Sequence, residues 1–129
     1  MKITIAWDNA EQSILYCAYT GDWVLEEYLA SIDESVSRVR SVDHRVDVVV
    51  NVVDRAAQTP PLWGLRSWRY ALINSPHNKG VTVVIPASAG VRAFAVALNR
   101  IARLRPDNRI LTADSLDEAR LLIQSLRSA

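Results

Sequence analysis

The chain has 129 residues, half of them apolar, and a formal net charge of +1. A chain of this length buries roughly two-thirds of its unfolded surface, so a single domain over 1–129 needs no disulfide or metal for its core. Cys17 is the only cysteine, which excludes an intrachain disulfide, and no apolar stretch approaches the roughly 18 residues of a membrane span. We therefore expect a soluble, cytoplasmic protein in which Cys17 is a small buried hydrophobe.

The charges are distributed unevenly along the chain. Residues 1–54 carry ten acidic and four basic side chains, whereas residues 55–113 carry nine basic side chains and one acid, Asp107. The basic stretch is either an ordinary solvated surface or a functional basic face. Nucleic acid is not expected as a partner, because no reading motif is present and the acidic first helix would repel phosphate.

The first half of the chain predicts a hairpin followed by a long helix. Lys2–Trp7 and Ser13–Thr20 are rich in strand-forming residues, and the segment between them begins with a turn-forming Asp-Asn pair. Gly21-Asp22 ends the second strand, with Asp22 as the expected N-cap. Apolar residues at alternating spacings of four and three then predict an amphipathic helix over about 23–40.

The second half alternates buried strands with helices. Val46–Val53 is apolar at nearly every position, as expected for a central strand, with Asp47 and Asn51 as exceptions. A helical stripe follows over 61–74, then a strand at Gly80–Ile85, a helix that begins near Ser88, a short strand at Arg109–Thr112 and a last helix. The order β-β-α-β-α-β-α-β-α predicts a single α/β domain with a mostly parallel, mixed five-stranded sheet and about four helices.

Two segments and this order of elements resemble a known superfamily. They are Gly-Asp-Trp-Val-Leu-Glu-Glu-Tyr-Leu at 21–29 and Asn-Arg-Ile-Leu-Thr-Ala-Asp-Ser-Leu-Asp-Glu-Ala-Arg-Leu-Leu-Ile at 108–123. Together they resemble, over almost the whole chain, the STAS-like superfamily, which comprises the sulphate-transporter and anti-sigma-factor-antagonist domains, and in particular its bacterial STAS/SEC14-like relatives. The resemblance implies a STAS-like α/β fold and a regulatory role exercised by protein–protein contact.

The turn that carries the regulatory chemistry of those antagonists is altered here. Their landmark is a phosphorylatable serine in an Asp-Ser-Ser-Gly-like turn at the start of the helix after the third strand. The matching turn reads Gln58-Thr59-Pro60-Pro61-Leu62, so only Thr59 offers a hydroxyl. Thr59 is accordingly either a phosphosite or a plain cap or turn residue.

The sequence offers no motif for catalysis, a cofactor or a metal. The four glycines form neither G-x-G-x-x-G nor G-x-x-x-x-G-K, and there is no G-x-S-x-G elbow. His44 and His77 lie 33 residues apart in expected loops, without a local ligand pattern. We expect a protein that is not an enzyme and has no cofactor or metal.

Polar residues gather at the expected carboxyl ends of the parallel strands, where open α/β sheets usually bind ligands. Asp54 and Arg55 follow the central strand beside Gln58 and Thr59. Ser88 begins the helix after the next strand, where Arg92 and free backbone N–H groups could hold an anion. The alternatives are a ligand pocket among this turn, Pro86–Ser88 and Thr112, or a local salt bridge, turn and helix cap.

The helix over 61–74 carries aromatic and arginine side chains. Trp63, Arg66, Arg69 and Tyr70 are of the types that dominate protein interfaces, although they could instead fold onto the domain's own edge. We therefore expect a non-catalytic regulatory or protein-interaction domain that docks a partner, or a second copy in a homodimer, through the turn and helix at 58–70. The alternative function is binding of a small anionic or lipid-like ligand at the carboxyl ends of the strands.

Overall fold

The computed structural model describes residues 3–20, 23–53, 70, 74–86, 89–102 and 109–128. Within these ranges five strands form one sheet, and three helices pack on it. The elements are β1 (Ile3–Trp7), β2 (Ile14–Tyr19), α1 (Leu25–Arg40), β3 (Val46–Val52), β4 (Lys79–Ile85), α3 (Ala89–Ala102), β5 (Ile110–Thr112) and α4 (Leu116–Ser128). The helix expected over 61–74 lies outside the described residues, apart from Tyr70 and Asn74.

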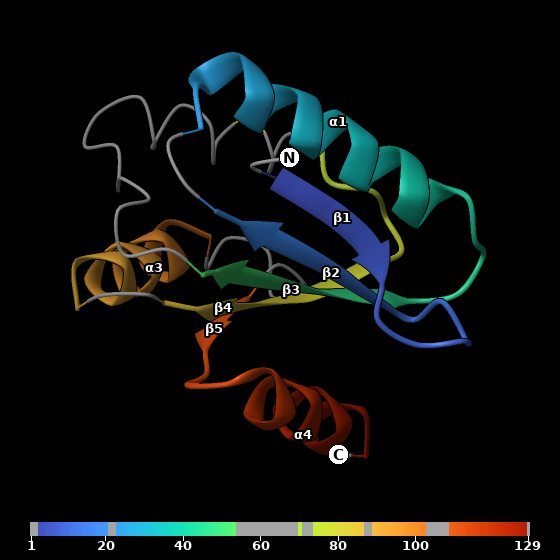
Figure 1. The fold of residues 1–129 in the computed structure, drawn as a ribbon. Helices are drawn as coiled ribbons and strands as arrows, with labels where there is room; N and C mark the ends of the chain where they lie inside the picture. Colours follow the sequence, from blue (N-terminus) through green and yellow to red (C-terminus); the bar gives the residue numbers. More distant parts are fainter. Residues whose placement is uncertain are drawn as a thin grey trace.

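The strands lie side by side in chain order, β1-β2-β3-β4-β5. β1 is antiparallel to β2, and the other three pairs are parallel, which confirms the mostly parallel, mixed five-stranded α/β sheet. Right-handed crossovers between successive parallel strands place their helices on one face of the sheet. Figure 1 shows α1 and α3 on that face, whereas α4, which follows the last strand, covers the other.

Apolar side chains fill both faces of the central strands. On the α1 face, Leu15 and Cys17 of β2 pack with Val48 of β3. On the α4 face, Val49 and Val83 pack with Ala119 and Ile123 of α4. Cys17 is 2% exposed, so the expected buried cysteine is confirmed. Burial on both sides explains why β3 and β4 read as nearly continuous apolar runs.

The start of α1 differs from the expectation that Asp22 caps a helix over 23–40. The helix begins at Leu25, with Val24 as its N-cap. Glu27 supplies the cap interaction from inside the first turn, because its Oε1 accepts the Val24 N–H over 3.1 Å. A carboxylate at this position satisfies a backbone donor and also complements the helix dipole.

Asn9 organises the turn between β1 and β2. Its Oδ1 accepts the backbone N–H groups of Ser13, at 3.0 Å, and Ile14, at 3.2 Å. Gln12 takes a positive φ of 55° in this turn. The predicted hairpin turn is therefore closed by a side chain that substitutes for backbone partners.

In the described part of the chain, no helix is both long and apolar enough to cross a membrane.

Candidate functional site

Asp47, near the start of β3, is a completely buried carboxylate. Its Oδ1 accepts the Val81 N–H over 2.8 Å and Arg45 Nε over 3.0 Å, and its Oδ2 accepts Arg127 Nε over 2.9 Å. Buried charges are tolerated in proteins when they are paired and hydrogen bonded, as this one is. The carboxylate therefore joins β3, β4 and the end of α4 at the amino edge of the sheet.

Further hydrogen bonds hold this edge together. Arg127 Nη2 donates to the Ser13 carbonyl over 2.6 Å, which ties α4 to the hairpin turn. Asn78 Nδ2 donates to the carbonyls of Val39, at 2.8 Å, and His44, at 3.0 Å, which ties the start of β4 to the end of α1 and the loop after it. The side chains at this edge thus project from a backbone that is fixed on several sides.

Gly80 lies against the Asp47 and Arg45 side chains. The pairing of β3 with β4 is irregular here, because Val46 lies opposite Lys79 and Val48 opposite Thr82. A Cβ on Gly80 would overlap Asp47 Oδ1 and Arg45 Nε and would lie 2.9 Å from Arg45 Cζ. Glycine is required because a bulged strand brings its backbone against a charged pair.

A pocket of about 350 Å³ opens beside the start of β4. β5 has three residues and pairs only with Thr82–Val84, so in the described part of the chain no strand lies beyond Lys79–Val81 on that side. Gly80, Val81 and Leu126 line the pocket together with a set of polar side chains: Arg45, His77, Asn78, Lys79 and Arg109.

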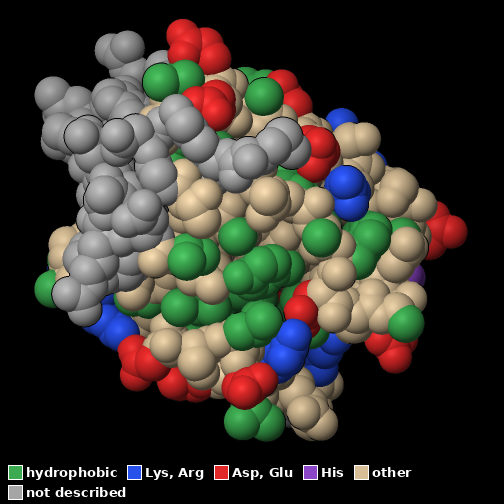
Figure 2. All heavy atoms as spheres, viewed as in Figure 1, with side chains coloured by type: hydrophobic (Ala, Val, Ile, Leu, Met, Phe, Trp, Pro, Cys, Tyr) green, Lys and Arg blue, Asp and Glu red, His purple; other side chains and the backbone are tan. Residues whose placement is uncertain are grey.

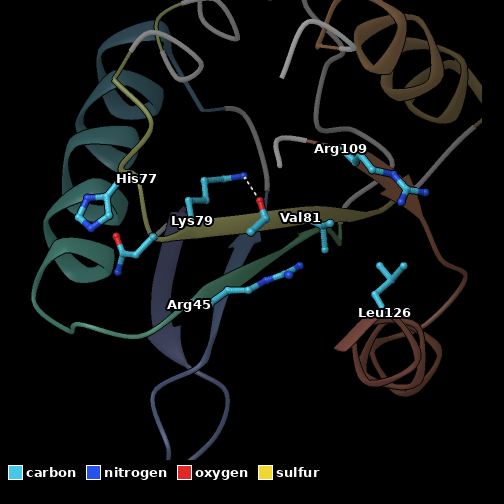
Figure 3. A pocket seen from close by; sticks show the side chains of 8 residues that line it. Arg45, His77, Lys79, Val81, Arg109 and Leu126 are labelled. Atoms are coloured by element: carbon cyan, nitrogen blue, oxygen red, sulfur yellow. Dashed lines mark hydrogen bonds between the residues drawn. The ribbon is translucent and has the colours of Figure 1, made fainter. Parts of the chain in front are cut away.

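Figure 3 shows how the pocket residues are arranged. Arg45, Val81 and Leu126 lie on one side of β4, and Arg109 extends from the start of β5. Lys79 extends on the other side, and its Nζ donates back to the Gly80 carbonyl over 3.1 Å. The open edge of β4 therefore carries basic groups on both sides of the strand.

Among the described residues, the lining contains three bases, Arg45, Lys79 and Arg109, and no acidic residue. The charge of Arg45 is offset by Asp47, from which its Nη2 lies 3.0 Å. Arg109 is exposed, and its guanidinium has no hydrogen-bond or ion-pair partner among the described residues. A guanidinium with no counter-charge in the described part of the chain, in a lining that holds two other bases, makes this pocket attractive to an anion.

Lys79 is half-buried, and the burial of its amine lowers its pKa to about 8. The neighbouring Asp47 carboxylate acts in the opposite direction, and the Arg45 guanidinium adds to the lowering. With this pKa the Lys79 amine begins to lose its proton just above neutral pH.

The carboxyl edge, where the sequence predicts a ligand pocket, holds one described basic residue in an ion pair. Arg92 Nη1 donates to Thr112 Oγ1 over 3.3 Å, and its Nη2 pairs with the Asp114 carboxylate. Arg92 and Thr112 thus lie together, with the arginine charge offset by an acid. Five other residues predicted for this pocket lie outside the described residues: Asp54, Arg55, Gln58, Thr59 and Ser88.

Tyr70 is the one described member of the predicted interaction surface. It is 37% exposed, and its hydroxyl donates to Asp33 Oδ1 over 2.7 Å. This hydrogen bond raises the pKa of Tyr70 and joins it to α1 of the same chain. Trp63, Arg66 and Arg69 lie outside the described residues, so docking through them stays a prediction.

The sequence carries a signal for the amino-edge pocket that motif searching does not use. Each of the parallel strands β3, β4 and β5 is preceded by or begins with a basic residue: Arg45, Lys79 and Arg109. The amino ends of parallel strands meet at one edge of a sheet, so three such residues converge there. An aspartate within an apolar strand, two residues after Arg45, indicates the same edge, because a buried carboxylate needs donors.

The described residues include no group of three or more His, Cys, Asp or Glu side chains that could hold a metal ion. Comparison of the chain with protein-family models, curated proteins and solved structures found no match. The candidate site therefore rests on the geometry of this chain alone.

Proposed function

We propose that this protein binds a small anionic ligand, such as a phosphate or carboxylate compound, in the pocket at the amino ends of β3, β4 and β5. Binding is non-catalytic in this proposal. The single observation that carries it is the described part of the pocket lining, which combines Arg45, Lys79 and Arg109 and includes no acidic side chain. A volume of about 350 Å³ is within the range of small-molecule sites.

Arg109 is the main anchor in this proposal. Arg109 is exposed, lines the pocket and has no side-chain partner among the described residues, so an anion can pair with it without displacing a described carboxylate. Arg45 is held in place by Asp47 and contributes a pre-positioned guanidinium. Pre-positioned donors favour binding because little side-chain freedom is lost when the ligand arrives.

The carboxyl edge is the competing location for an anion. There Arg92 already pairs with Asp114, so a ligand would have to displace a carboxylate. This difference between the two edges favours the amino edge. Replacing one arginine by glutamine at each edge makes the same chemical change at both locations. The edge at which this change weakens anion binding is the edge that holds the anion.

The test is thermal and calorimetric titration of the wild type, Arg109→Gln and Arg92→Gln with inorganic phosphate, pyrophosphate and citrate in chloride buffer. A ligand at a hundred times its dissociation constant stabilises the folded protein by about 2.7 kcal/mol. We expect Arg109→Gln to lose at least tenfold in affinity and Arg92→Gln to match the wild type.

The reverse pattern would place the anion at the carboxyl edge, as the sequence predicts. A wild type that responds to none of the three anions would contradict anion binding at either edge.

A further inference from the structure

β1 is the outer strand of the sheet, and in the described part of the chain no strand pairs with its outer edge. Its sequence, Ile-Thr-Ile-Ala-Trp, contains no charged residue and no proline, and its register with β2 has no bulge. Proteins usually protect edge strands with charges, prolines or bulges, because an open row of N–H and C=O groups pairs with other strands. Figure 2 shows a band of apolar side chains over this region, between charged groups of α1 and α4.

The register of the hairpin determines which backbone groups point outward. The Asp8 N–H donates to the Ile14 carbonyl, so the backbone groups of residue 8 point toward β2. Because these groups alternate along an antiparallel strand, those of Thr4 and Ala6 also point toward β2. The N–H and C=O groups of Ile3, Ile5 and Trp7 therefore form the open row.

We propose that two copies of this chain pair antiparallel through β1 and form one continuous ten-stranded sheet around a twofold axis at Ile5. In this register Ile5 lies opposite its own copy, and Ile3 lies opposite Trp7 of the second copy. The three outward residues of each chain then satisfy one another with about six backbone hydrogen bonds. An isologous contact of this kind closes as a dimer.

The side chains of β1 suit this register on both faces. Ile3, Ile5 and Trp7 are only partly buried under α1, and the pairing sets Ile beside Ile and Ile beside Trp across the junction. Cross-strand pairs of aromatic and β-branched residues stabilise antiparallel sheets. On the opposite face, Thr4 of each copy lies beside Ala6 of the other copy. Both side chains are exposed, and neither is large enough to obstruct the approach of the two strands.

The charges of α1 are also complementary under the same symmetry. α1 packs on β1 and β2, so it lies within one or two strand spacings, each of about 4.8 Å, of the junction. Its first turn contains Glu26 and Glu27, and its last turn contains Arg38 and Arg40. The twofold axis makes the two α1 helices antiparallel, so the acidic start of each faces the basic end of the other. This complementarity favours a second copy over an unrelated strand as the occupant.

The test uses charge pairs at the two exposed positions that the register places opposite each other. Lysine at both positions, in Thr4→Lys/Ala6→Lys, sets like charges across the junction. Lysine and glutamate, in Thr4→Lys/Ala6→Glu, set opposite charges at the same positions. Both variants change two exposed side chains, so each serves as the folding control of the other, with circular dichroism to verify the fold.

Sedimentation or light scattering at roughly 100 µM, where even a weak interface with a micromolar dissociation constant is populated, gives the mass of each protein. We expect a dimeric wild type, at least a tenfold weaker dimer in Thr4→Lys/Ala6→Lys, and recovery of the dimer in Thr4→Lys/Ala6→Glu. A monomeric wild type would overturn the proposal. A dimer that persists unchanged in Thr4→Lys/Ala6→Lys would also overturn it, and would move the interface elsewhere, with the segment at 58–70 as the next candidate.

Discussion

Asp47 and Arg127 form an ion pair that joins the start of β3 to the end of α4, eighty positions later in the chain. Arg127 Nε donates to Asp47 Oδ2 over 2.9 Å, and Arg127 Nη2 lies 2.8 Å from the same oxygen. The carboxylate is fully buried, whereas the arginine side chain is 30% exposed. The pair therefore anchors α4 and also keeps a negative charge beneath the basic pocket.

Neutralising this aspartate should destabilise the protein strongly. In Asp47→Asn, Arg45 and Arg127 lose their shared counter-charge, and the amide nitrogen faces donors instead of acceptors. Removal of one partner from a buried pair costs about 3–5 kcal/mol, and we expect a loss in that range from urea unfolding.

Asp114→Asn is the matched control for this measurement. Asp114 also pairs with an arginine, Arg92, but its side chain is 73% exposed. Exposed pairs contribute less than about 1 kcal/mol, so the control should change stability little. Equal effects of the two substitutions would contradict a structural role of the buried pair.

Gly80→Ala should be destabilising for a steric reason. The added Cβ would overlap the Asp47 carboxylate and the Arg45 side chain, and neither can move without breaking their hydrogen bonds. We expect a loss of roughly 1–3 kcal/mol in the free energy of unfolding, the usual cost of overpacking a well-packed region.

Gly90→Ala provides the comparison, because Gly90 is exposed and lies in the first turn of α3. Alanine there should leave stability unchanged or raise it by about 0.5–1 kcal/mol through helix propensity. A Gly80→Ala protein as stable as Gly90→Ala would show that the close contact is relieved at no cost.

The pH dependence of stability should reveal the buried amine of Lys79. Burial lowers the pKa of Lys79 from 10.5 to about 8, so between these two values the unfolded chain binds a proton that the folded chain does not. Lys79 therefore opposes folding fully below pH 8, and its penalty disappears as the pH rises to about 10.5. The penalty is at most about 3 kcal/mol.

The measurement compares Lys79→Met with the wild type by urea unfolding at pH 7 and pH 10. We expect the variant to gain stability relative to the wild type at pH 7, and this advantage to shrink at pH 10. The comparison cancels the titration of groups that do not interact with Lys79. A difference in stability that does not change with pH would show that the amine keeps its ordinary pKa.

Cys17 should react slowly with thiol reagents in the folded protein. It is 2% exposed, and burial raises its pKa to about 11, although a contact of 3.7 Å between its Sγ and Ser35 Oγ acts in the opposite direction. At pH 8 only about 0.1% of a thiol with this pKa is thiolate, the reactive form. A chromogenic disulfide should therefore label the native protein at least a hundredfold more slowly than the urea-unfolded protein, and equal rates would contradict a buried thiol.

The sequence predicts the elements of this fold well because their signals are local. The apolar run of β3 and the helical spacing of α1 appear within single segments, and the structure places both within a few residues of the predicted bounds. The predicted N-cap of α1, Asp22, was wrong. The N-cap is Val24, and the capping hydrogen bond comes from Glu27, which lies inside the helix. A side chain that caps backward leaves no mark that distinguishes it from a solvated acid.

The candidate site is less accessible from the sequence because its parts are distant along the chain. Arg45, Lys79 and Arg109 each stand at the start of a strand, yet only the parallel pairing of those strands brings them to one edge. The sequence by itself determined an α/β sheet with basic residues at strand starts and one acid inside an apolar strand. The tertiary structure decided that Asp47 meets Arg127, that Arg92 is neutralised while Arg109 has no partner in the described chain, and that the pocket lies where β5 stops short. These outcomes depend on register and on long-range contacts, which hydrophobic periodicity does not encode.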